Sequence, residues 1–168
     1  RFRQLGRDGR GPQFYDHFEK LFAADAVDLA TEWMLFVVNL QYGYDLPRTV
    51  IDFELGAPLT MGGESREAAI RADRGWQASG VQVRAGGPYQ VVASGQLTLA
   101  EEPKPWVSEA QGISIDYFDG QPIGRLMACL RAADPADGET MLRVLPVGAE
   151  RTFTAPVTGT LYWRVNDA

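Results

Sequence analysis

The sequence predicts a mainly β protein, an antiparallel β-sandwich or jelly roll with an N-terminal helical segment. Two observations support this fold class. Between residues 13 and 42 apolar side chains recur at the spacing of a helix that buries one face. From Thr49 onward short alternating apolar runs are separated by Gly, Pro and Asp, as is typical of a sandwich or jelly roll. We therefore expect a linker or frayed end at 1–12, a helical segment at 13–46 and a β-sandwich at 48–168.

The N-terminal part is expected to become helical only after its first residues. Residues 1–12 are rich in Gly and Arg and show no apolar period, which favours a linker or frayed end. The apolar stripe then runs from Phe14 to Leu40, Gly43 offers a C-terminal stop and Pro47 prevents continuation. One long helix or two shorter ones fit this stretch. Its apolar face must be covered by the sandwich, by a second copy of the chain or by an upstream domain.

The strands are expected from short runs bounded by turn residues. Asp119-Gly120 is a strong reversal signal, so the runs on either side of it should pair as a hairpin. The polar, proline-containing stretch 101–105 is expected to be a loop that Trp106 closes. The expected strands lie at 50–55, 81–83, 89–93, 97–99, 113–118, 123–131, 142–147, 152–154 and 161–165.

The composition argues against two classes of partner, nucleic acids and membranes. The chain has 168 residues, of which 45% are hydrophobic and 23% charged, as in ordinary globular proteins. Its formal net charge of −6 argues against nucleic acid, because that partner requires a basic stripe to offset phosphate charge. The longest strongly apolar stretch, residues 33–38, is six residues long, whereas a helix needs roughly 20 to cross a bilayer. We expect neither a nucleic-acid partner nor a membrane span.

The sequence offers little catalytic chemistry. His17 is the only histidine, and its place in an apolar helical stripe favours a partly packed surface residue over a catalytic base. Cys129 stands alone in an apolar run and is expected in the core. Asp116 and Asp119 could form a carboxylate pair for glycoside hydrolysis, but they flank a hairpin turn whose geometry explains the Asp-Gly by itself. We therefore expect a protein that is not an enzyme.

Calcium is the metal that acidic sandwich loops could hold, through carboxylates, amide oxygens and backbone carbonyls. Asn166 and Asp167 are the candidates, since two oxygen-bearing residues follow the last expected strand. The same pair is equally natural as a turn. The residues alone thus indicate a β-sandwich domain without specifying its ligand.

Several segments, taken in order and with their spacing, resemble the calcium-dependent galactophilic bacterial lectins and their domain relatives. The resemblance covers about residues 70–168. It implies a small jelly-roll sandwich of the galactose-binding-domain type, in agreement with the strand pattern. The segments that carry it are 75–81, 91–95, 111–113, 124–126, 153–156 and 159–167.

The resemblance also implies roles for single residues. Asn166 and Asp167 would begin a calcium loop, with Asp167 bridging the metal and sugar hydroxyls. The backbone carbonyl of Leu99 would also bind the metal, and Gln111 would donate to a sugar hydroxyl. Ser108 and Glu109 stand where the family has His-Pro. The family's calcium loop continues beyond the Asn-Asp pair, so the calcium site is expected to be incomplete in this chain.

Trp106 completes the set of ligand-binding candidates, Gln111, Asp167 and Trp106, because aromatic rings stack on sugar faces. The leading hypothesis is a carbohydrate-binding, lectin-like module, calcium-dependent by resemblance and part of a larger bacterial protein. Two alternatives stay open: a structural or protein-interaction domain with a degenerate sugar site, and the accessory domain of an upstream enzyme. The expected partners are a glycan and, through residues 13–42, a second copy or the rest of the chain. An extracytoplasmic location follows only by analogy.

Overall fold

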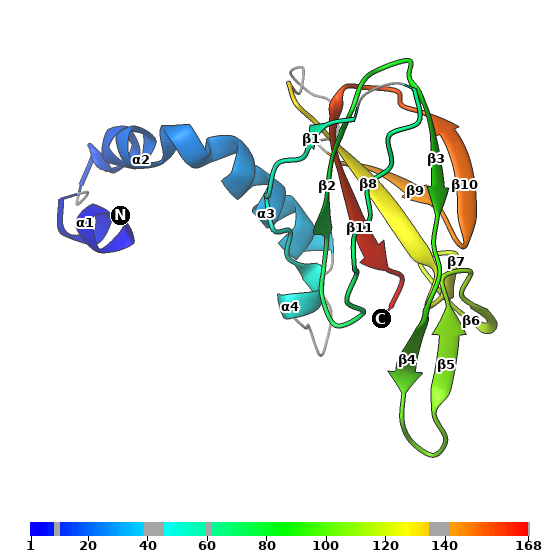
Figure 1. The fold of residues 1–168 in the computed structure, drawn as a ribbon. Helices are drawn as coiled ribbons and strands as arrows, with labels where there is room; N and C mark the ends of the chain where they lie inside the picture. Colours follow the sequence, from blue (N-terminus) through cyan, green and yellow to red (C-terminus); the bar gives the residue numbers. More distant parts are fainter. Residues whose placement is uncertain (9–10, 39–45, 60–61, 135–141, 168) are drawn as a thin grey trace. The chain divides into compact units, whose positions relative to one another are not determined.

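The computed structural model describes residues 1–8, 11–38, 46–59, 62–134 and 142–167. The chain divides into two compact units, which we call the helical unit (Arg1–Tyr42) and the β-unit (Gly43–Ala168). The protein is mainly β, with several antiparallel sheets and helices at its N-terminus, as the sequence predicted at this coarse level (Figure 1). Among the helices that the structure describes, none is both long and apolar enough to span a membrane.

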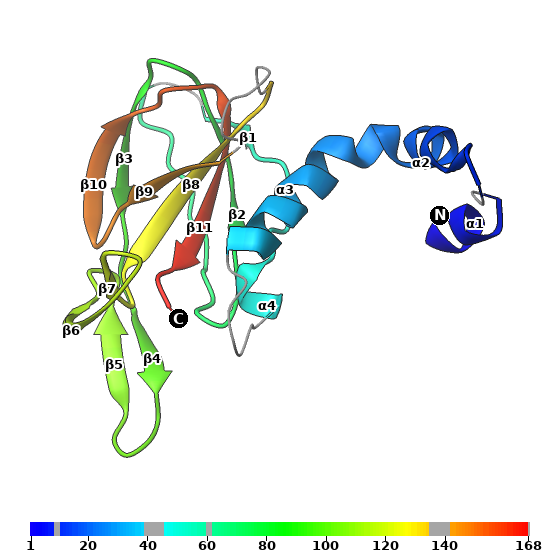
Figure 2. The same ribbon diagram turned by 180° about the vertical axis from the view of Figure 1, so that it is seen from behind.

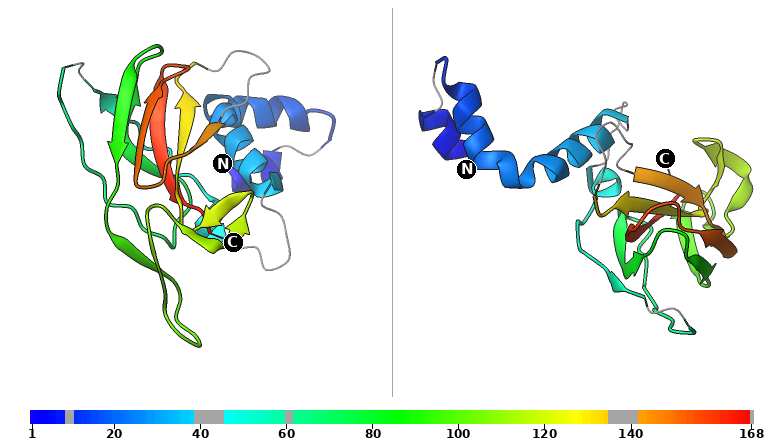
Figure 3. Two further views of the ribbon diagram at one scale, coloured as in Figure 1. Left: turned by 90° about the vertical axis from the view of Figure 1, so that its right-hand side faces the viewer. Right: turned by 90° about the horizontal axis from the view of Figure 1, so that it is seen from above.

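The helical unit begins earlier than the sequence indicated. Residues 1–12 were expected to be a linker or frayed end, yet they contain helix α1, which lies beside α2 (Figure 3). Leu5 is buried, and Arg1 forms an ion pair with Asp25, so tertiary contacts stabilise a segment that lacks an apolar period. The expected helix end near Gly43 lies outside the described residues. The elements are α1 (Phe2–Asp8), α2 (Phe14–Phe22), the 3-10 turn η1 (Ala23–Asp25) and α3 (Ala26–Val38).

The main sheet of the β-unit has five strands. Its centre is formed by β11 and β8, which pair antiparallel without interruption from Gly159↔Ala132 to Val165↔Leu126. All the neighbouring strands are antiparallel except β1 and β2, which run parallel. The order is β1 (Ala57–Pro58), β2 (Gln77–Val83), β11 (Gly159–Val165), β8 (Leu126–Ala132) and β9 (Leu142–Pro146), and the short helix α4 (Leu46–Thr49) precedes them in the chain.

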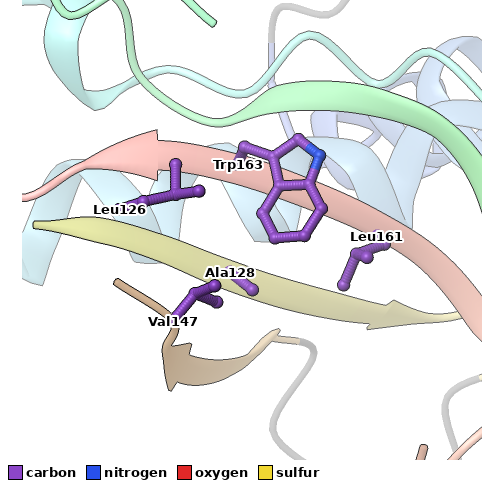
Figure 4. Close-up of a cluster of buried hydrophobic side chains, with 5 residues drawn as sticks. All are labelled: Leu126, Ala128, Val147, Leu161 and Trp163. Atoms are coloured by element: carbon purple, nitrogen blue, oxygen red, sulfur yellow. The ribbon is translucent and has the colours of Figure 1, made fainter. Parts of the chain in front are cut away.

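The core lies between this sheet and the antiparallel pair β3 (Pro88–Val92) and β10 (Glu150–Thr154). One inward-facing cluster contains Leu161 and Trp163 of β11, whose spacing of two places both on the same face (Figure 4). Phe153 of β10 packs against this cluster and also against a second cluster that includes Leu130. Side chains of β3 and β10 therefore cover one face of the main sheet.

Two further hairpins lie at one end of the β-unit. The first pairs β4 (Gln96–Ala100) with β5 (Trp106–Glu109) and extends away from the main sheet (Figures 1 and 2). The second pairs β6 (Ile113–Phe118) with β7 (Gln121–Ile123). The Asp119-Gly120 reversal predicted between the latter two strands is present, with φ values of 50° and 73°.

Some strand predictions were wrong for local reasons. Residues 50–55 form only an isolated bridge between Ile51 and Trp76. The Asp52 carboxylate accepts the N–H groups of Glu54 and Ala78, and Phe53 adopts a φ of 41°, so the extended run is broken. The predicted strand 123–131 is likewise interrupted at Gly124, and the strand β5 was not expected. The jelly-roll topology itself stays a prediction.

Candidate ligand site

The turn formed by Gly124 and Arg125, between β7 and β8, is where several predicted site segments meet. We call it the 124–125 turn. The N–H of Gly124 donates to the Asn166 carbonyl at 2.7 Å, and the N–H of Asn166 donates to the Arg125 carbonyl at 2.7 Å. A Cβ on Gly124 would lie 2.4 Å from Ser108 Oγ and 3.2 Å from Leu99 Cδ1. The β4–β5 hairpin therefore packs directly on this turn, next to the end of β11.

Asn166 connects the end of β11 to the β6–β7 hairpin. Its side chain is buried, with a relative exposure of 1%. The amide nitrogen lies 2.9 Å from the Phe118 carbonyl oxygen and 3.0 Å from those of Gln121 and Pro122. An amide group has only two N–H donors, so the three carbonyls share them. The Asn166 side chain thus holds the hairpin turn against the sheet.

Asp167 has a cationic partner within the chain. Its Oδ2 accepts a hydrogen bond from Arg48 Nη1 at 2.5 Å, and the carboxylate is 12% exposed. The pair joins α4 to the residue that lies two positions past β11. A metal ion binding at this carboxylate would compete with the guanidinium for the same oxygen.

Gln111 is exposed, and its side chain lies against the turn between β9 and β10. The Ala149 N–H donates to Gln111 Oε1 at 3.1 Å, and the same oxygen lies 2.6 Å from the position of a Cβ on Gly148. A backbone N–H can bond only to the oxygen end of the amide. The NH2 end, which the resemblance assigns to a sugar hydroxyl, therefore takes no part in this hydrogen bond.

Trp106 opens strand β5 and pairs with Ala100 of β4. It is 39% exposed. It stands two positions from Ser108, so the two side chains lie on the same face of the strand, and Ser108 packs at the 124–125 turn. Trp106 therefore presents part of its ring to solvent on the hairpin that borders this turn.

The predicted site residues come from neighbouring segments without converging on one point. Leu99 and Asn166 lie directly at the 124–125 turn, and Gly112, next to Gln111, would place a Cβ 2.9 Å from the Arg125 nitrogen. The side chains then diverge, because Gln111 contacts the β9–β10 turn whereas Asp167 contacts α4. The arrangement suits contact with an extended ligand better than enclosure of a single ion.

The described residues do not by themselves fit a calcium ion. No group of three His, Cys, Asp or Glu side chains with metal-binding geometry occurs among them. Asp167 Oδ2 already pairs with Arg48, whereas the contacts of the Asn166 side chain use its amide nitrogen and not the oxygen that a calcium ion would bind. A calcium site requires six to eight oxygen ligands, so Asp167 would have to exchange Arg48 for the metal and other oxygen ligands would have to join it.

Sequence reasoning did not identify the cation that lies near this end of β11. The Arg164 guanidinium lies over the Trp76 ring, with 4.9 Å between Cζ and the ring centroid. Burial lowers the pKa of Arg164, while Asp119, Cys129 and Asp167 act in the opposite direction. Alternation along β11 predicts that Arg164 and Trp163 point to opposite faces of the sheet. It does not predict the stacking partner of Arg164, because Trp76 lies far away in sequence.

The residues considered for catalysis have structural surroundings. Cys129 is fully buried in β8, as predicted, and burial raises the pKa of its thiol to about 12. Asp119 forms the hairpin turn, and Asp116 Oδ1 accepts the N–H of the next residue at 2.8 Å. His17 Nδ1 lies 2.9 Å from the Gln13 carbonyl oxygen within the helical unit. None of these contacts joins a nucleophile to a base.

Comparison with known proteins leaves this site without an assigned ligand. The chain matches no protein-family model, no curated protein and no solved structure. The function must therefore be argued from the residues and contacts described above.

Proposed function

We propose that the β-unit is a carbohydrate-binding, lectin-like module without catalytic activity, folded as a jelly roll of the galactose-binding type. One observation carries the proposal. The segments that contain Leu99 and Gln111 meet Asn166, which lies far along the chain from both, at or beside the 124–125 turn. The lectin resemblance assigns these same positions to one site, so their spatial proximity supports it.

Three side chains would contact the sugar. The exposed part of the Trp106 ring offers a flat apolar surface on which a pyranose can stack. The NH2 group of Gln111 can donate to a hydroxyl, because only its oxygen is held by Ala149. Asp167 supplies a carboxylate that accepts from hydroxyls while Arg48 holds it in place.

Calcium enters the proposal only through the resemblance. Because Arg48 occupies Asp167 Oδ2, we expect the chain to bind calcium weakly and to bind sugar without requiring the metal. Titrating the glycan once with calcium and once with a chelator shows whether sugar binding requires the metal. A strict calcium requirement would contradict the metal-free version of the proposal while preserving its lectin part.

The test is a glycan array followed by calorimetry with the best glycan. Trp106→Ala should weaken binding about tenfold or more, as expected for a central aromatic anchor. Gln111→Ala should weaken binding by a smaller factor. Ile115→Ala is the control, because this apolar side chain is 73% exposed on the neighbouring hairpin and should leave the affinity unchanged. No binding to any glycan, with or without calcium, would refute the proposal.

The second candidate is a protein-interaction domain that acts through the segment 13–42. The observation in its favour is the exposure of large apolar side chains on α2 and α3, among them Tyr15 and Trp33. Soluble proteins rarely expose a contiguous apolar patch without a partner. A chain that binds no glycan but associates through these helices would support this candidate over the first.

A further inference from the structure

An aromatic stripe on α2 passes from buried to exposed. Phe14, Phe18 and Phe22 follow one another at intervals of four residues and therefore share a face of the helix. Their rings stack in sequence, with centroid separations of 6.3 Å and 4.9 Å. Phe22 is buried, whereas Phe18 and Phe14 are exposed. The contacts that cover one end of the stripe thus leave its other end open.

Helix α3 also has an uncovered apolar face. Thr31 and Leu35, four residues apart, are buried. Trp33 and Val37, on the opposite side of the helix, are exposed, and Trp33 is 67% exposed. A helix with apolar residues on both sides is normally buried on both. Among the described residues of the helical unit, none covers the Trp33 face of α3, although its composition favours burial.

The charges of the helical unit are divided between its parts. Arg1, Arg3 and Arg7 lie in or beside α1, where Asp8 is the only acidic residue. Residues 14–38 carry one lysine and five carboxylates. Arg1 pairs with Asp25, so the basic part already contacts the acidic part within one chain. Because the basic and the acidic residues lie on different parts of the unit, the basic part of one copy can face the acidic part of a second copy.

We propose that two copies of this chain associate through their helical units. The exposed faces of α2 and α3 pack against those of the partner, and each basic α1 faces the acidic α2–α3 segment of the other copy. A two-fold axis permits this arrangement, because the same patch is then used on both copies. An anionic membrane fits less well, since the acidic charge of α2–α3 would be repelled.

The size of the apolar surface indicates that both helices take part. A stable interface buries about 800 Å² on each partner. A helix of 13 residues such as α3 is about 20 Å long and about 10 Å wide, so one face of it offers too little area alone. Adding the exposed aromatic side chains of α2, which are Phe14, Tyr15 and Phe18, increases the apolar area that the unit offers.

The dimer does not depend on what the β-unit binds. It would nevertheless give the proposed sugar-binding function two sites per particle, a consequence that rests on that function. Linked sites raise the apparent affinity for a multivalent glycan surface about a hundredfold or more without any new contact. A monomeric variant should therefore lose affinity for the surface while keeping its affinity for a single soluble glycan.

Sedimentation velocity of the full 168-residue chain over a range of concentrations tests the proposal. The wild type should form dimers below about 100 μM, as specific interfaces do. Trp33→Asp should shift the equilibrium to monomer, and Val37→Lys should do the same if the first variant is poorly folded by circular dichroism. Ile115→Asp, an equally drastic change at an exposed apolar position of the β-unit, should leave the dimer intact.

The charge component has a test of its own. Arg3→Glu should weaken the dimer by severalfold at low salt, and the difference from the wild type should shrink at high salt because exposed charges are screened. A wild-type monomer at every concentration would overturn the proposal. So would a dimer that Ile115→Asp disrupts and Trp33→Asp does not. Neither result would bear on sugar binding, which is measured separately with a monovalent glycan.

Discussion

Arg48 Nη1 donates to Asp167 Oδ2 at 2.5 Å, although the two residues are 119 positions apart in the chain. The contact links α4, at the start of the β-unit, to the residue that lies two positions past β11. Asp167 is largely covered, whereas Arg48 is more than one-third exposed. The pair thus joins the two ends of the unit at the candidate site, in surroundings that water still reaches.

The Arg48–Asp167 pair should make a modest, measurable contribution to stability. In a double-mutant cycle with Arg48→Gln and Asp167→Asn, we expect a coupling energy of about 0.5–1 kcal/mol, because water screens the exposed guanidinium. Urea unfolding of the four proteins measures it. The exposed local pair of Arg71 and Asp73 is the control and should show no measurable coupling. Strict additivity at Arg48 and Asp167 would contradict the expectation.

Asn166 should contribute more, because its own side chain is buried. Asn166→Ala removes the donors shared by the three carbonyls of the β6–β7 hairpin and should lower the free energy of unfolding by about 2–3 kcal/mol. Asn166→Asp keeps the shape of the side chain but replaces its NH2 donor with an oxygen. This variant should therefore lose at least as much free energy of unfolding as Asn166→Ala. Gln90→Ala, which removes an exposed hydrogen bond to Glu150, should stay within about 0.5 kcal/mol. If Asn166→Ala lost no more free energy of unfolding than Gln90→Ala, the Asn166 hydrogen bonds would not be stabilising.

The fold class could be predicted because each strong signal was local. Alternation located β2, β3, β6 and β11, and the helical period located α2 and α3. Helix α1 could not be located in this way, since Leu5 is its one buried apolar residue among those whose side chains are described, and Arg1 pairs with Asp25 only in the folded unit. The strand expected at 50–55 failed because Asp52 accepts backbone N–H groups that a strand would use otherwise.

The candidate site was harder to predict than the fold. The sequence indicated which residues carry useful chemistry, but their partners lie far away along the chain. Asn166 bonds carbonyls 44 to 48 positions earlier, and Asp167 bonds Arg48. The lectin resemblance treats both residues as metal ligands. The structure engages the Asp167 carboxylate with Arg48, whereas Asn166 uses its amide nitrogen to hold the β6–β7 hairpin, and only tertiary packing reveals these partners.

Gly124 is a position where only glycine should be tolerated, and Gly120 provides a matched control. Both glycines have positive φ, 80° and 73°, so an alanine at either costs about 1–2 kcal/mol of backbone strain. At Gly120 nothing lies within 4 Å of the added Cβ, whereas at Gly124 it would lie 2.4 Å from Ser108 Oγ. Gly124→Ala should therefore cost about 2 kcal/mol more than Gly120→Ala in urea unfolding. If the two variants lost equal free energies of unfolding, the β4–β5 hairpin would have to move away from the added methyl group without strain.

Cys129 should make the protein less stable in alkali. Burial raises the pKa of its thiol from 9.0 to about 12, so above pH 9 the unfolded chain loses this proton while the folded one keeps it. The resulting stabilisation is complete below pH 9 and is lost as the pH rises towards 12, at about 1.4 kcal/mol for each pH unit. Between pH 8 and pH 10.5 the wild type should lose about 2 kcal/mol through this residue.

Cys129→Ala isolates that effect from the other groups that titrate in alkali. Tyr162, whose pKa is also raised by burial, lies opposite Cys129 in the β8–β11 pair and remains in the variant. The variant should be less stable than the wild type at pH 8, because a buried sulfur is removed. By pH 10.5 the gap should close or reverse, since only the wild type loses the thiol contribution. Urea unfolding curves that fall in parallel over this pH range would show that the Cys129 thiol ionises as readily in the folded protein as in the unfolded one.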